Sequence, residues 1–206
     1  MQSAGDDLIS IAVAGPREAQ SVARQLRATG AWIEVVAGID SVVVRFDLAS
    51  TDRAMAGELI DKASVEPFDE SRASAEHFEI PVVYGGDSGP ELASICEHLQ
   101  LSEDEFVALH TAREYEVDMI GFTPGFAYIG GLDARLEIPR LQEPRARVAA
   151  GSVGIAGGRT GLYALPGPGG WPLIGRTSFE LFRPDSELVF ALQPGTRVRF
   201  TDARGT

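Results

Sequence analysis

The segment between Gly121 and Thr177 constrains the fold more than any other part of the sequence. Its 57 residues include 13 glycines and 6 prolines, so these two residue types make up a third of it. The remainder is rich in aromatic and branched apolar side chains, which disordered Gly/Pro tracts lack. Folded chains use glycine at positive φ or where backbones approach closely, and proline in rigid turns. The segment therefore predicts short strands joined by tight turns, as in a barrel or sandwich.

Apolar periodicity predicts a small α+β domain at the N-terminus. The expected order is βαββα, with strands at 8–14, 33–37 and 41–46 and helices at 17–29 and 52–64. This order is typical of helices covering one face of an antiparallel sheet. The polar residues 66–75, which include Pro67, predict a linker. We therefore expect an N-terminal domain over residues 1–76 and a β-barrel domain over residues 77–206.

The barrel domain is expected to begin with two helices between strands. A strand at 78–84 precedes a helix at 91–99, and a strand at 114–120 precedes the Gly/Pro-rich segment. Ser102 and Glu105 form a capping-box pattern, which predicts a helix from there to residue 112. All that follows residue 120 reads as β-structure, ending with strands at 188–192 and 197–200.

Composition and charge exclude several classes of function. No apolar run reaches the roughly 20 residues that a membrane span needs, and the acidic N-terminus is unlike a secretory signal. The single cysteine, Cys96, excludes an internal disulfide framework, so we expect a cytoplasmic protein. Residues 1–112 carry 20 acidic and 7 basic side chains, a balance of −13, and residues 113–206 carry 10 and 11, a balance of +1. This field repels nucleic acids and anionic membranes; it serves solubility or attracts a basic partner.

Familiar catalytic motifs are missing from the sequence. There is no P-loop and no nucleophile elbow, and the pattern assigns no catalytic residue. The glycines of 151–158 match a phosphate-binding loop only weakly, and they are equally typical of barrel corners and bulges. The three histidines, at 77, 98 and 110, have no metal-ligand spacing, so we expect no metal site. His110 lies near the end of the capped helix, where a cation would suit the helix dipole.

The strongest candidate for a binding site is a window without acidic residues. Residues 144–179 contain no Asp or Glu, yet they carry several arginines and hydroxyl groups. Such a composition favours a site for a carboxylate or phosphate, although surface arginines paired with distant acids are the ordinary alternative. The candidate binding residues are the arginines Arg145, Arg159 and Arg176, the hydroxyl residues Ser152, Thr160 and Tyr163, and the aromatic residues Phe126, Tyr128 and Trp171. We expect Arg176 to contribute most, because it follows a Gly-Gly-Trp turn.

Several long motifs in this half resemble one protein family in order and spacing. They are residues 81–90 (PVVYGGDSGP), 121–132 (GFTPGFAYIGGL), 138–140 (IPR), 151–158 (GSVGIAGG) and 167–177 (GPGGWPLIGRT). The family is that of the Kip inhibitor and the B component of 5-oxoprolinase, also known as allophanate hydrolase subunit 1. It is related to the carboxyltransferase domain, subdomains C and D, of urea carboxylase. Arg159 departs from the family pattern, in which glutamine is usual there.

The resemblance implies a cyclophilin-like β-barrel and a role in a cytoplasmic hydrolase. On this basis the chain is expected to be the B component of an ATP-dependent 5-oxoprolinase, which converts 5-oxoproline to glutamate, and to be inactive without its partner. The implied cofactor is ATP, with room for Mg²⁺ in the complex. The implied partners are a 5-oxoprolinase C component (allophanate hydrolase subunit 2) and, further, an A component. Two alternatives stay open: inhibition of a sensor histidine kinase, and allophanate hydrolase or urea carboxylase chemistry.

Overall fold

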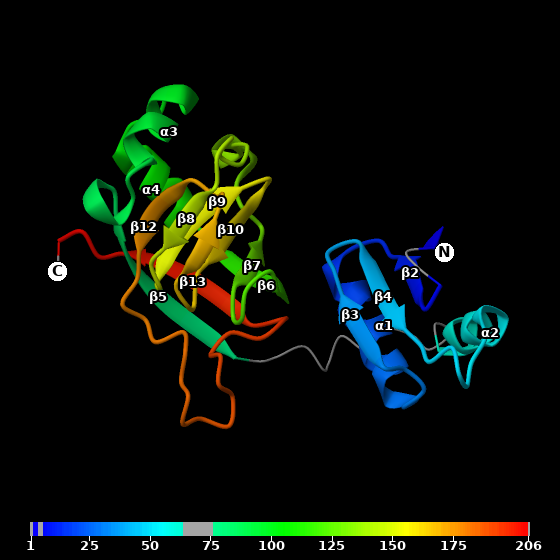
Figure 1. Cartoon of the computed structure of the whole chain (residues 1–206). Helices are drawn as coiled ribbons and strands as arrows, with labels where there is room; N and C mark the ends of the chain where they lie inside the picture. The colour runs from blue at the N-terminus through cyan, green and yellow to red at the C-terminus, as the bar shows by residue number, and fades with distance from the viewer. Residues whose placement is uncertain (1, 4–5, 64–75, 206) are drawn as a thin grey trace. The chain divides into compact units, whose positions relative to one another are not determined.

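The computed structural model of the protein describes residues 2–3, 6–63 and 76–205 (Figure 1). The chain divides into two compact units, Met1–Arg72 and Ala73–Thr206. The linker expected at 66–75 lies outside the described residues. Among the helices of the described ranges, none has the length and apolar character needed to cross a membrane.

The first unit is a four-stranded antiparallel sheet with two helices. Its elements are β1 (Gln2–Ser3), β2 (Leu8–Ala12), α1 (Pro16–Ala28), β3 (Glu34–Ala37), β4 (Ser41–Arg45) and α2 (Arg53–Ala63), and the strand order is β1-β2-β4-β3. Helix α1 packs on the sheet through Ala19, Ala23 and Leu26, whose spacing of four and three residues places them on one helical face. The predicted βαββα order is confirmed, with the short strand β1 added at its start.

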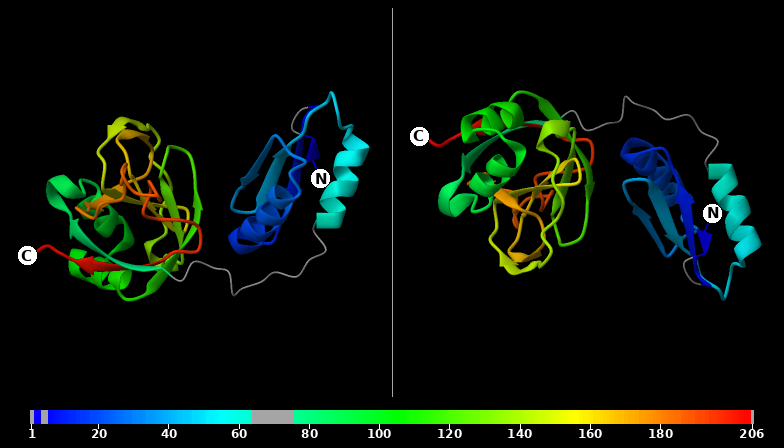
Figure 2. Two further views of the ribbon diagram at one scale, coloured as in Figure 1. Left: turned by 90° about the horizontal axis from the view of Figure 1, so that it is seen from below. Right: turned by 90° about the horizontal axis from the view of Figure 1, so that it is seen from above.

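The second unit is built around a closed barrel of seven strands, in the order β10-β7-β6-β13-β5-β12-β9 (Figures 1 and 2). The barrel strands are β5 (His77–Tyr84), β6 (Glu114–Ile120), β7 (Ala127–Gly130), β9 (Ser152–Ala156), β10 (Arg159–Leu162), β12 (Leu173–Arg176) and β13 (Arg197–Asp202). The remaining elements are α3 (Leu92–Leu99), α4 (Glu103–Thr111), the 3₁₀ turns Gly86–Ser88 and Ala134–Leu136, and a separate two-stranded sheet of β8 (Arg145–Val148) and β11 (Gly167–Gly169). The predicted barrel is therefore confirmed.

Alternation along the strands separates an interior core from an outer face. Ala127 and Ile129 of β7 point inward with Val153 and Ile155 of β9, and their neighbours along each strand point outward. Helices α3 and α4 add further side chains, such as Ile95, to the interior core.

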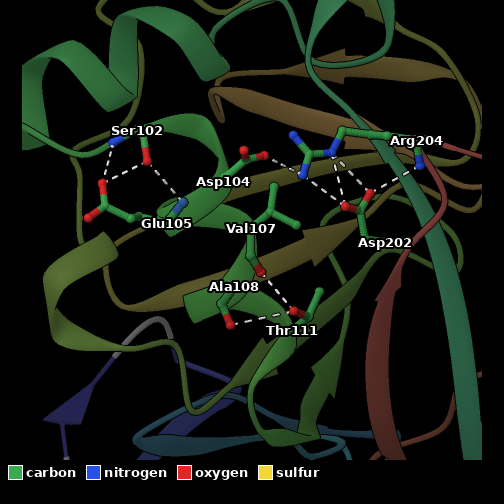
Figure 3. Close-up of polar contacts among 8 residues, drawn as sticks. All are labelled: Ser102, Asp104, Glu105, Val107, Ala108, Thr111, Asp202 and Arg204. Atoms are coloured by element: carbon green, nitrogen blue, oxygen red, sulfur yellow. Dashed lines mark hydrogen bonds and ion pairs between the residues drawn. The ribbon is translucent and has the colours of Figure 1, made fainter.

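Helix α4 is fixed at its start as the sequence predicts. The Glu105 N–H donates to the Ser102 hydroxyl at 3.2 Å, and the Ser102 N–H donates to Glu105 Oε2 at 2.8 Å (Figure 3). The same figure shows Arg204 joining Asp104 on α4, at 2.9 Å, to Asp202 at the end of β13, at 2.8 Å. These contacts hold the helix against the strand.

The strand expected at 188–192 does not form. The structure gives this region a single isolated bridge between Phe182 and Phe190. A closed barrel offers no free strand edge to which a further strand could pair. Phe190 packs instead against the backbone of Gly125, so closely that a Cβ there would lie 2.2 Å from its ring. The segment 134–136, also read as β-structure, forms a 3₁₀ turn capped by the Asp133 side chain.

Candidate functional site

Four of the candidate aromatic and hydroxyl residues meet in one cluster on the outer face of the barrel. Phe126 makes edge-to-face contacts with Tyr128 and Tyr163, both with ring centroids 4.8 Å apart. Trp171 lies at 5.6 Å from Phe126 and 5.7 Å from Tyr128 in the same geometry. Phe126, Tyr163 and Trp171 are buried, and Tyr128 is half-buried. The four rings therefore form a small second core outside the barrel.

Glycines of the adjoining strands make room for this cluster. A Cβ on Gly161 would lie 2.6 Å from Phe126 Cζ and 2.9 Å from the Trp171 ring, and one on Gly154 would lie 3.0 Å from Trp171 Cβ. Gly157 and Gly158, both at positive φ, form the turn between β9 and β10. The glycine run 151–158 thus belongs to a strand, a turn and the packing of a tryptophan. A strand follows it rather than the helix of a dinucleotide-binding loop.

The three candidate arginines take part in three different local contacts. Arg145 forms an ion pair with Glu91, and Arg159 forms one with Asp118 at 2.9 Å. Arg176 is exposed, and its Nε donates to the Ala150 carbonyl oxygen at 3.0 Å. Within the described residues, Arg176 takes part in no ion pair. Its charge is therefore the one of the three that remains available for an external anion.

Backbone contacts around Gly151 position Arg176. The Thr177 N–H donates to the Gly151 carbonyl oxygen at 2.9 Å, and the Gly151 N–H donates to the Tyr163 carbonyl oxygen at 2.7 Å. Gly151 has φ +79°, and a Cβ there would lie 2.3 Å from the Thr177 oxygen, so only glycine fits. Ser152, the next residue, is buried and opposes Arg176 in the pairing of β9 with β12. The base of the Arg176 side chain is thus held in place.

Thr160 points into the barrel, away from the aromatic cluster. His110 is fully buried and forms hydrogen bonds through both ring nitrogens, with Tyr84 Oη at 2.7 Å and Thr160 Oγ1 at 2.9 Å. Burial lowers the pKa of His110 to about 3, so its ring is neutral. The expected role of His110 as a cation at the helix end is wrong, because its side chain faces the core rather than solvent.

Two buried polar atoms near the aromatic cluster have no hydrogen-bond partner within the described part of the chain: Tyr163 Oη and Arg145 Nη1. A Cβ on Gly169 would lie 2.3 Å from Tyr163 Oη, and Gly169 pairs with Arg145 across β11 and β8. Both groups therefore lie beside the β8–β11 sheet. Burial raises the pKa of the Tyr163 hydroxyl, so this group stays protonated and can donate a hydrogen bond.

Glu91 is a residue that sequence reasoning missed. Its carboxylate holds Arg145 and also accepts the Leu173 N–H at 2.8 Å, which ties the start of α3 to β12. Its partners lie 54 and 82 residues away, so no local pattern could reveal it. Across the described ranges, no three His, Cys, Asp or Glu side chains are grouped so that they could hold a metal ion.

Comparison with known proteins places the chain in a family. The family described as "Carboxyltransferase domain, subdomain C and D" matches residues 2–192. The B component of the 5-oxoprolinase of Escherichia coli O157:H7, which is named as a subunit of that enzyme, is 43% identical over 171 residues. These residues cover 82% of this chain and 77% of that protein.

Two solved structures extend the comparison to the fold. The crystal structure of TTHA0988 superposes with a TM-score of 0.79 at 32% identity, and the match covers 97% of this chain. This chain spans only 40% of the length of TTHA0988. Kluyveromyces lactis urea carboxylase shares the fold, with a TM-score of 0.77 at 16% identity over 98% of this chain and 21% of its own. The chain therefore belongs to the carboxyltransferase subdomain C and D family, together with the B component of 5-oxoprolinase.

Proposed function

We propose that the chain is the B component of an ATP-dependent 5-oxoprolinase-type amidohydrolase, which opens the lactam of 5-oxoproline to give glutamate. The observation that carries this proposal is the 43% identity with the E. coli 5-oxoprolinase component over most of both chains. The likeness to urea carboxylase is far lower, at 16%, so urea-type chemistry has support from the fold alone. The relative is named as a subunit, which supports assembly with other proteins.

In this proposal the chain works as part of a heteromer. Its partners are a 5-oxoprolinase C component (allophanate hydrolase subunit 2) and, further, an A component. ATP, with Mg²⁺, is the cofactor of the complex and supplies the free energy that activates the lactam. The described residues present no metal cluster, and the sequence has no P-loop, so we place the phosphates' ligands largely in the partner chains.

A genetic experiment tests the proposed function. Deleting the gene in the source organism should cause 5-oxoproline to accumulate, because its conversion to glutamate is blocked. Expression of this chain from a plasmid should return 5-oxoproline to the parental concentration. An unchanged 5-oxoproline concentration in the deletion strain, measured by mass spectrometry of cell extracts, would contradict the proposal.

Arg176 is the residue of this chain that we propose for binding an anionic group of the substrate or nucleotide. Its charge is uncompensated within the described residues, and its position is held by the Gly151–Thr177 backbone contacts. Arg176→Ala in the reconstituted complex should raise KM by roughly tenfold to a hundredfold, the equivalent of one lost charge-assisted hydrogen bond of about 1.5–3 kcal/mol. Arg176→Lys should lose nearly as much, since lysine cannot make the forked contact.

Arg199→Ala provides the matched control, because Arg199 is an exposed arginine on β13 of the same barrel. We expect this variant to keep the wild-type KM. Thermal melting of both variants should match that of the wild type, since neither side chain is buried. Equal KM values for Arg176→Ala and the wild type would assign Arg176 to the ordinary solvated surface.

A further inference from the structure

The loop between β6 and β7 holds an exposed aromatic residue in a strained backbone conformation. Phe122 has φ +68°, in the left-handed region that bulky residues avoid, and 64% of it is exposed. The Thr123 N–H donates to the Gly121 carbonyl oxygen at 2.9 Å, so Phe122 is the central residue of a γ-turn of the rare, positive-φ type. Backbone strain with no evident structural benefit is characteristic of functional sites.

The rest of this loop is rigid. Phe126 N–H donates to the Thr123 oxygen at 3.0 Å across Pro124 and Gly125, and Gly125 has the positive φ of a type II turn. The Gly121 N–H closes the loop on the Phe126 oxygen at 3.1 Å. From below, the Phe190 ring contacts Gly125, and the Phe126 ring supports that of Phe122 at 5.9 Å. The exposed ring is therefore presented in one fixed position.

The surface around Phe122 is uncharged. Residues 119–132 and 160–175 contain no Asp, Glu, Lys or Arg. The two stretches lie side by side, because a Cβ on Gly167 would contact Thr123 and one on Gly125 would lie 2.9 Å from Ala164. Protein interfaces are depleted of charge at their centre and enriched in aromatic residues, so this surface has the composition of an interface core.

We infer that the loop 121–126 is a docking site for the companion C component of the complex, with Phe122 as an aromatic anchor that enters an apolar pocket of that protein. This inference rests on the proposed function. A protein is favoured over a small ligand because Phe122 projects from a convex turn. The companion is favoured over other proteins because relatives are named as subunits, and because this fold makes up only 40% of the TTHA0988 chain, so further chain accompanies it there. A rigid anchor loses little conformational freedom on binding, which strengthens association.

Phe122→Asn tests the inference, because asparagine tolerates the left-handed conformation and removes the ring. The variant should keep the melting temperature of the wild type, since lost ring contact and relieved strain oppose each other. Its affinity for the purified C component, measured by calorimetry with the full-length chain, should fall at least about thirtyfold, as for an interface hot spot. Phe122→Tyr should retain binding. Val83→Ser, at another exposed apolar residue on β5, should bind like the wild type.

Two further measurements separate the possible outcomes. Equal affinity of Phe122→Asn and the wild type for the C component would overturn the inference, while turnover by the wild-type complex would leave the proposed function intact. No binding of the wild type to the C component would overturn both. Sedimentation of the chain alone addresses a second copy as the occupant: dimers that Phe122→Asn dissociates would refute a heteromeric role for the loop.

Discussion

Acidification from pH 7 to pH 4.5 is expected to lower the free energy of unfolding of the barrel unit by about 2.5 kcal/mol. The cause is His110, whose pKa in the folded chain is lowered by burial from 6.5 to about 3. Between these values the unfolded chain binds a proton that the folded chain cannot, so stability falls as the pH falls. Above about pH 7 both states are neutral at His110, and the effect vanishes. Urea unfolding at the two pH values, followed by Trp171 fluorescence in a Trp32→Phe background, measures it.

The variant His110→Gln supplies the control. Glutamine does not titrate and can still bond to Tyr84 or Thr160, so the variant should be less stable at pH 7 but nearly independent of pH between 7 and 4.5. Carboxylates with ordinary or lowered pKa, such as Asp133, protonate at lower pH and contribute little to this window. An equal loss of stability in His110→Gln and the wild type would assign the effect to other groups.

Replacement of Trp171 by alanine should destabilise the barrel unit by about 3–5 kcal/mol, the usual cost of truncating a large buried aromatic residue. Trp171 contacts Phe126 and Tyr128 and lies over the glycine positions 154 and 161, so its loss would leave a cavity that the flanking strands cannot fill. Trp171→Phe should lose much less, because a ring remains. Far-ultraviolet circular dichroism during urea unfolding measures both variants.

Gly161→Ala tests the same packing from the opposite side. The added Cβ would meet Phe126 at 2.6 Å and Trp171 at 2.9 Å, so this variant should also be destabilised, although by overpacking rather than by a cavity. Wild-type stability in both Trp171→Ala and Gly161→Ala would mean that the outer aromatic cluster contributes nothing to the barrel.

Local signals predicted the elements that depend on local interactions. The capping box of Ser102 and Glu105 satisfies backbone groups within the first turn, and the helix begins where the sequence places it. Strand β6 matches its predicted bounds, 114–120, because alternation alone defines a half-buried strand. The 188–192 region shows the limit of that signal: its apolar residues pack on the barrel, but closure of the barrel leaves no strand edge to pair with.

The candidate site was predictable in composition but not in geometry. The sequence predicts which residues are unusual, such as the arginines of the acid-free window, yet the partners Glu91 and Asp118 lie 54 and 41 residues away. Position in a helix likewise placed His110 near the dipole without revealing that its ring faces the core. Strained Phe122 had no sequence signal of its own beyond an aromatic residue between turn formers.

The most direct test of the proposed function is a reconstituted reaction. The purified chain, its C and A component partners, ATP, Mg²⁺ and 5-oxoproline are combined, and glutamate and ADP are measured together. We expect both products to form at equal rates in the full mixture, and neither to form when this chain is omitted or when 2-pyrrolidone replaces 5-oxoproline. Glutamate formation that does not depend on this chain, or a full mixture that consumes no 5-oxoproline, would contradict the assignment as the B component of a 5-oxoprolinase.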